Sequence, residues 1–215
     1  MGVTQPPLRI GLYGGAFDPP HEAHRALAES ALAQLRLDLL LILPTGQAWH
    51  KSRPLTSAEH RLAMSRLAFA DLPNTRIDDR EMRRTGPTYT VDTLEEVAAE
   101  HPSAELFLII GADQLHKFRS WYRWRDVLAK ATLAVANRAE RVGSDAISPA
   151  HRPSDLSSVD IPFVALTMPP LNVSATALRS HMQQDWLDGV LDDVPLVSPS
   201  VAGYISTHNL YQNHS

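Results

Sequence analysis

The chain has 215 residues, of which 44% are hydrophobic, and this is enough for one domain with a sizeable core. Its formal net charge of −4 argues against a broad basic surface for nucleic acid, so any anion site must be a local cluster. The chain contains no cysteine, which excludes disulfides, thiolate catalysis and cysteine zinc sites and fits a reducing compartment.

The N-terminal residues, MGVTQPPLRI, include no long apolar stretch, and no run in the chain approaches the length of a membrane span. We therefore expect no signal peptide, no membrane association and a cytoplasmic location. The sequence leaves the oligomeric state open, and a homo-oligomer is one of the alternatives.

Apolar runs alternate with helix-forming segments along the whole chain. We expect strands at 8–13, 39–44, 75–82, 105–111, 132–138 and 163–168, and helices near 26–37, 57–69, 91–101, 111–121, after 174 and near 198–208. This alternation predicts an α/β fold: a doubly wound, Rossmann-like parallel sheet with helices on both faces, in a single domain over 1–215. The polar, aperiodic composition of residues 138–160 predicts a surface excursion. We expect a C-terminal helical part at residues 171–215.

The segment RIGLYGGAFDPPHEAH, residues 9–24, is the strongest candidate for a ligand site. Gly14 and Gly15 end a buried strand, and His21 and His24 follow with a spacing that places them on one helix face. A glycine turn followed by a helix start, at the carboxyl end of a parallel strand, suits a phosphate group. Such a histidine pair is also found on ordinary helix surfaces. Metal binding by the pair is disfavoured because no third ligand has helix spacing.

A second candidate is NVSATALR, residues 172–179. Ser174 and Thr176 offer hydroxyls and backbone N–H groups at a predicted helix start, and Arg179 adds a planar cationic fork. The alternative is an ordinary capped helix with a surface arginine.

Three further segments carry polar or aromatic groups beyond strand ends. Lys51 follows Trp49 and His50 in a loop, the string GPTYTVDTL spans 86–94, and GAD at 111–113 precedes an aromatic cluster. Each also fits a solvated loop, a helix cap or core packing. The dinucleotide fingerprint GxGxxG is absent after the first strand, which counts against a dehydrogenase.

Two of these strings together resemble a known superfamily. GGAFDPPHEAH is similar to GGTFDPxHxGH, the opening motif of the HxGH nucleotidylyltransferases, with Ala16 and Ala23 replacing threonine and glycine. NVSATALR resembles the second superfamily motif, ISSTxxR, with Val173 for isoleucine and Ala175 for serine. A contact made by that missing serine hydroxyl would be lost, whereas one made by its backbone N–H would survive.

The remaining strings narrow the resemblance to the bacterial nicotinate-nucleotide adenylyltransferases. These are the HK loop followed by HRLAM, the string TYTVDTL, the GxD triplet together with the Trp121 region that follows it, and the closing VAGYISTHNLY segment. Six such strings occur in the family's order, from Arg9 to Tyr211.

The resemblance implies transfer of an adenylyl group from ATP to nicotinate mononucleotide, giving deamido-NAD and pyrophosphate in NAD biosynthesis. Mg²⁺ would arrive with ATP, and no dedicated metal site is expected. The alternatives are another superfamily nucleotidylyltransferase, such as a phosphopantetheine adenylyltransferase, and a nucleotide-binding regulator without catalysis.

The implied roles fall into three groups. The catalytic residues would be His21, His24 and Arg179. The ATP-binding residues would be these three with Gly14, Gly15, Phe17, Gly111, Asp113, Ser174 and Thr176. The nicotinate mononucleotide-binding residues would be Lys51, Thr88, Tyr89, Trp121 and Tyr122. The sequence does not decide between the acid and the amide mononucleotide.

Overall fold

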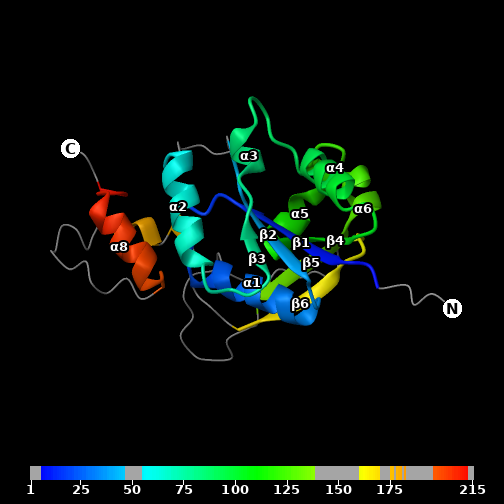
Figure 1. Cartoon of the computed structure of the whole chain (residues 1–215), viewed down its shortest axis with the longest axis horizontal. Coiled ribbons are helices and arrows are strands. Elements are labelled where there is room, and N and C mark those ends of the chain that lie inside the picture. Colours follow the sequence, from blue (N-terminus) through cyan, green and yellow to red (C-terminus); the bar gives the residue numbers. More distant parts are fainter. Residues whose placement is uncertain are drawn as a thin grey trace. The chain divides into compact units, whose positions relative to one another are not determined.

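The computed structural model describes residues 6–46, 55–138, 160–169, 175–176, 178–180, 182 and 196–212. Six strands of these residues form one sheet in the order β3-β2-β1-β4-β5-β6 (Figure 1). This is the strand order of a Rossmann-like, doubly wound fold, so the predicted fold class is confirmed. Among the described residues there is no helix whose length and apolar character would let it cross a membrane.

The elements follow the predicted alternation. The strands are β1 (Arg9–Gly15), β2 (Leu39–Pro44), β3 (Thr75–Ile77), β4 (Glu105–Gly111), β5 (Thr132–Arg138) and β6 (Val164–Met168). The helices are α1 (Glu22–Gln34), α2 (Ala58–Ala68), α3 (Arg80–Arg83), α4 (Thr90–Glu100), α5 (Ala112–Lys117), the 3-10 helix η1 (Phe118–Ser120), α6 (Trp124–Lys130) and α8 (Pro199–Thr207). Of the surface excursion expected at 138–160, only residues 138 and 160 are among the described residues.

Contacts divide the chain into two compact units. The first consists of Met1–Gly14, Leu27–Leu41 and Tyr89–Pro170, and the second of Gly15–Ala26, Ile42–Thr88 and Leu171–Ser215. The expectation of a single domain over 1–215 stays a prediction.

The first unit is built on parallel strand pairs. β1 pairs with β4, β4 with β5 and β5 with β6, all in parallel, and Figure 1 shows these strands running together. The interior of β4 is buried from Leu106 to Ile110, as expected for a central parallel strand. At the edge strand β6, the Gln34 side chain donates to the Thr167 carbonyl at 2.8 Å and accepts from its N–H at 3.0 Å. One amide therefore satisfies both backbone groups at this point of the sheet edge.

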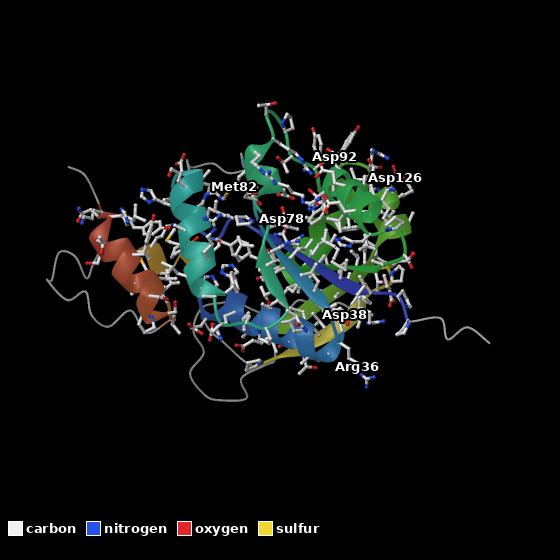
Figure 2. All side chains as sticks on the ribbon, in the orientation of Figure 1. Arg36, Asp38, Asp78, Met82, Asp92 and Asp126 are labelled. Atoms are coloured by element: carbon white, nitrogen blue, oxygen red, sulfur yellow. The ribbon has the colours of Figure 1, made fainter. Side chains whose placement is uncertain are left out.

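The turn from α1 into β2 is fixed by a carboxylate. Arg36 has a φ of 48°, and Asp38 lies two residues beyond it; Figure 2 labels both. The Asp38 carboxylate accepts from the Arg9 N–H at 2.8 Å, and the Asp38 N–H donates to the Arg9 carbonyl at 2.9 Å. These two bonds fix the start of β1 beside the start of β2.

The third strand ends earlier than expected. The sequence predicts a strand over 75–82, but β3 stops at Ile77 and α3 begins at Arg80. The Asp78 carboxylate accepts from the Arg80 N–H at 3.0 Å and from the Arg80 guanidinium at 3.0 and 2.7 Å, which turns the backbone out of the sheet. Burial opposes charge on Asp78, but the Arg80 hydrogen bonds outweigh it and hold the pKa of this carboxyl below its usual value. Figure 2 places Asp78 before α3 and Met82 on it.

In the second unit, α2 and α8 lie side by side (Figure 1). Ser57 caps α2, as predicted, by accepting from the His60 N–H at 3.4 Å. The His60 ring nitrogen Nδ1 lies 3.0 Å from the Tyr204 hydroxyl of α8, which joins the two helices.

Gly11 of β1 offers a stability test of the packing in the first unit. A Cβ at Gly11 would lie 2.5 Å from Leu37 Cδ1 and 2.9 Å from Ile109 Cδ1. We expect Gly11→Val to lower the free energy of unfolding by about 1–3 kcal/mol through overpacking. Urea unfolding would measure this change. In the matched control Gly203→Ala, the new Cβ meets nothing within 4 Å and lies in helix α8, so stability should rise by up to ~1 kcal/mol. An unchanged Gly11→Val protein would contradict the packing described.

Candidate active site

The loop after β1 is anchored by a buried aromatic ring. Phe17 has a φ of 47°, is 1% exposed, and packs edge-on against His24 and Phe69 with ring centroids 5.1 and 5.7 Å apart. Because its side chain is buried, Phe17 can contact a ligand only through its backbone. The ring of Phe17 therefore packs against His24 and supports the position of the imidazole.

His21 and His24 form a stacked pair. Their ring centroids are 3.7 Å apart and the planes differ by 21°. His21 lies one residue before α1 rather than inside its first turn, and its carbonyl accepts from the His24 and Arg25 N–H groups at 2.8 and 3.2 Å. The His21 N–H donates to His24 Nδ1 at 3.2 Å, so a neutral His24 carries its proton on Nε2. His24 can therefore donate from Nε2 to an anion.

Arg179 reaches the same loop from the far end of the sequence. Its Nη1 donates to the Asp18 carbonyl at 2.6 Å, and its Nη2 donates to the Thr176 hydroxyl at 3.1 Å. Asp18 precedes His21 by three residues. The structure thus brings a guanidinium against the loop that carries the paired imidazoles, as the sequence motifs predict.

Asp18 is a central residue that the sequence reasoning missed. Its side chain is buried, with 2% of the residue exposed. The Tyr211 hydroxyl donates to Asp18 Oδ1 at 2.7 Å, and the Thr56 N–H donates to Oδ2 at 3.5 Å. Burial, and then the Asp18 charge, raise the pKa of Tyr211 well above its usual range, so the phenol stays protonated and donates.

Arg61 ties three backbone segments together, and it was also missed. It is 2% exposed, and its guanidinium donates to four carbonyls: Thr56 at 2.9 Å, Ala16 at 3.0 Å, Thr45 at 2.7 Å and Gly46 at 3.1 Å. Burial lowers the pKa of Arg61, while the Asp18 charge acts in the opposite direction. The signals that could have identified these residues are the strings that contain them, GGAFDPPHEAH for Asp18 and HRLAM for Arg61.

In the first unit, the predicted nucleotide residues gather at the end of β4. Gly111 ends the strand, and a Cβ there would lie 2.7 Å from Asp113 Oδ1, so only glycine leaves this space to the carboxylate. Gln114 Nε2 donates to Asp113 Oδ2 at 2.8 Å. Burial, and then the Asp113 charge, raise the pKa of Tyr13 above its usual range.

The predicted aromatic residues for the pyridine end form two contacts in the first unit. The Tyr89 and Tyr122 rings lie 4.4 Å apart, and Trp121 packs on Phe118 at 5.1 Å. Tyr122 is 54% exposed, so this pair reaches solvent. The fold therefore brings the TYT string and the Trp121 region together, although 33 positions separate the two tyrosines.

The predicted site residues divide between the units. The first unit holds Gly14, Tyr89, Gly111, Asp113, Trp121 and Tyr122, and the second holds Gly15, Phe17, His21, His24, Thr88, Thr176 and Arg179. Thr88 Oγ1 is buried without a hydrogen-bond partner in the described part of the chain. Lys51 and Ser174 lie outside the described residues. Within the described ranges there is no group of three or more His, Cys, Asp or Glu side chains that could hold a metal ion.

Comparison with known proteins identifies the class first. The sequence profile of the cytidylyltransferase-like family matches residues 12–181, which include the paired histidines and Arg179. A solved structure titled Plasmodium falciparum nicotinic acid mononucleotide adenylyltransferase complexed with NaAD has a TM-score of 0.72 at 18% identity, covering 95% of this chain and 97% of that one. This likeness shows a shared fold.

Closer relatives identify the family. A protein of Albidiferax ferrireducens, named probable nicotinate-nucleotide adenylyltransferase, is 48% identical over 207 residues, or 95% of this chain and 98% of the relative. A protein of Chromobacterium violaceum with the same name is 39% identical over 218 positions, or 95% and 99% of the two chains. The chain belongs to the nicotinate-nucleotide adenylyltransferase family.

Arg61 gives a testable account of the loop structure. We expect Arg61→Leu to lower the free energy of unfolding by at least ~3 kcal/mol, since each orphaned buried acceptor costs about 1–3 kcal/mol. Chemical denaturation would measure the loss. Arg66, exposed on the same helix, is the matched control, and Arg66→Leu should change stability by no more than about 0.5 kcal/mol. If Arg61→Leu lowered the free energy of unfolding no more than Arg66→Leu does, the four carbonyl contacts would not contribute to stability as described.

Proposed function

We propose that the protein transfers the adenylyl group of ATP to nicotinate mononucleotide. A phosphate oxygen of the mononucleotide attacks the α-phosphorus of ATP, the bond from that phosphorus to the bridging oxygen breaks, and pyrophosphate leaves. The products are deamido-NAD and pyrophosphate. The observation that carries the proposal is the Arg179 guanidinium bound to the loop that bears the stacked His21–His24 pair.

The two imidazoles would act on the charge that develops at the α-phosphorus. With Nδ1 of His24 accepting from the backbone, Nε2 of the neutral ring carries the proton that would be donated to a phosphate oxygen. Preorganised donors of this kind are worth most where negative charge grows in the transition state. No covalent intermediate is needed, so positioning can supply ~7–11 kcal/mol of the acceleration.

Arg179 and the helix start at Ser174–Thr176 would hold the β- and γ-phosphates. A guanidinium presents paired donors that match phosphate oxygens. Two of its donors are bound by Asp18 and Thr176, which limits the rotation of the fork. Gly14, Gly15, Phe17, Gly111 and Asp113 would complete the nucleotide site.

The acceptor would bind through its aromatic end. Trp121 would stack on the pyridine ring, with Thr88, Tyr89 and Tyr122 around it and Lys51 on a phosphate. A stack of Trp121 on an aromatic base is compatible with its half-buried place beside Phe118.

Mg²⁺ would accompany ATP. Magnesium is held mainly by substrate phosphates and water, with few protein carboxylates. The ion would neutralise charge on the leaving pyrophosphate. A cytoplasmic location stays a prediction, and the oligomeric state stays open.

Pyrophosphate release with a panel of acceptors tests the reaction. We expect release from Mg-ATP with nicotinate mononucleotide, and none with phosphopantetheine. Comparing nicotinamide mononucleotide in the same assay determines the choice between acid and amide. ATP binding without release for any acceptor would favour a non-catalytic regulator and overturn the proposal.

His24 is the first residue to test. We expect His24→Ala to lower turnover at least ~100-fold, the scale of losing one transition-state donor. Steady-state pyrophosphate release measures it. His101 provides the control. It follows the C-terminal end of α4, whereas Tyr89 precedes the N-terminal end, and His101→Ala should keep turnover near the wild-type value. Near-normal turnover of His24→Ala would rule out the assigned role.

Trp121 separates the two substrates. We expect Trp121→Ala to raise the KM for the mononucleotide about tenfold, because one aromatic stack is worth about 1–3 kcal/mol. The KM for ATP should stay unchanged. Trp121→Phe keeps an aromatic face and should retain most of the affinity. If the alanine variant loses both substrates equally, the residue supports the fold rather than the pyridine ring.

A further inference from the structure

Tyr211 links the C-terminal segment to the loop after β1. It lies four residues beyond α8 and has a φ of 65°. Its hydroxyl donates to Asp18 Oδ1 at 2.7 Å, across 193 positions of sequence, and lies 3.9 Å from Met64 Sδ. The end of the described chain therefore makes a directed polar contact with the loop that leads to His21.

Asp18 accepts hydrogen bonds on two different groups, its carboxylate and its backbone carbonyl. Its carboxylate accepts from Tyr211, and its backbone carbonyl accepts from Arg179 Nη1 at 2.6 Å. The Thr56 N–H fixes the second carboxylate oxygen at 3.5 Å. Because Asp18 is 2% exposed, water is not available to replace these donors. The Asp18 carbonyl accepts from Arg179 and the Asp18 carboxylate accepts from Tyr211. The orientation of the carbonyl therefore depends on the position of the carboxylate.

The Tyr211 hydroxyl is suited to this task chemically. A phenol next to a buried carboxylate, in a site shielded from water, is a donor whose bond to a charged acceptor is stronger than a neutral one. The buried guanidinium of Arg61 fixes the carbonyl of Ala16, two residues before Asp18. The loop is held at its start by Arg61 and at Asp18 by Tyr211.

We propose that Tyr211 is a positioning residue for nucleotide binding: its hydroxyl, acting through Asp18, aims the Arg179 guanidinium at the triphosphate of ATP. This inference rests on the ATP half of the proposed function and is independent of the acceptor. In this role Tyr211 needs no contact with the nucleotide, because it acts by fixing the Asp18 carbonyl that Arg179 uses.

The test is Mg-ATP affinity measured by calorimetry on the full-length chain. Tyr211→Phe removes one oxygen and keeps the ring and its backbone conformation. We expect a loss of affinity of about tenfold, the scale of one hydrogen bond to a charged group. In turnover assays the KM for ATP should rise while the KM for the mononucleotide stays unchanged.

A double-mutant cycle separates positioning from folding. In an Arg179→Ala background, Tyr211→Phe should change Mg-ATP affinity by less than about twofold, since the guanidinium it aims is gone. Tyr204→Phe is the matched control: it also removes a phenol oxygen of the second unit, the one 3.0 Å from His60 Nδ1. We expect that variant to bind Mg-ATP as the wild type does.

Three results would overturn the inference: unchanged affinity in Tyr211→Phe, an equal loss in the presence and absence of Arg179, or an equal loss in Tyr204→Phe. The proposed function is judged separately. If the wild type binds Mg-ATP but releases no pyrophosphate with nicotinate mononucleotide, the proposed reaction fails and the cycle still decides the role of Tyr211. If the wild type does not bind Mg-ATP, both fail.

Discussion

The guanidinium of Arg61 is the contact on which the order of the second unit rests. Backbone carbonyls at the ends of loops have no partner in a helix or strand, and burying them without a donor is costly. Arg61 meets the carbonyls of Ala16, Thr45, Gly46 and Thr56 at once. One planar, charged fork therefore fixes the loop after β1, the loop after β2 and the segment before α2.

The proposed phosphate site is built on that frame. Asp18 follows Ala16 by two residues and binds Arg179 through its carbonyl and Tyr211 through its carboxylate. Phe17, between them, supports His24 with its ring. Arg179 and Tyr211, from the later part of the sequence, thus bind this loop near the N-terminus before any substrate arrives. Such preorganisation suits a reaction in which the protein positions substrates and stabilises charge rather than forming covalent bonds.

How far the sequence predicts the structure differs between elements. β4 and β5 match their predicted bounds because continuous apolar runs bounded by turn residues have few alternatives as central strands. β3 was predicted too long because a hydrogen bond from the Arg80 N–H to the Asp78 carboxylate ends it. The residue types alone are also compatible with a longer strand. A motif predicted that Arg179 belongs to the site. Its partner, the Asp18 carbonyl, could not be predicted in this way, because every residue has a carbonyl.

The sequence therefore determined the order of the elements, the fold class and the chemical groups of the candidate site. Hydrophobic periodicity, glycine turns and helix starts are local, and a few residues suffice to specify each. Only the tertiary structure decided which donor meets which acceptor: Arg61 with four carbonyls, and Tyr211 with Asp18. The physical reason is that such pairings are set by burial across long sequence separations, where removal of water forces each polar group to find a partner.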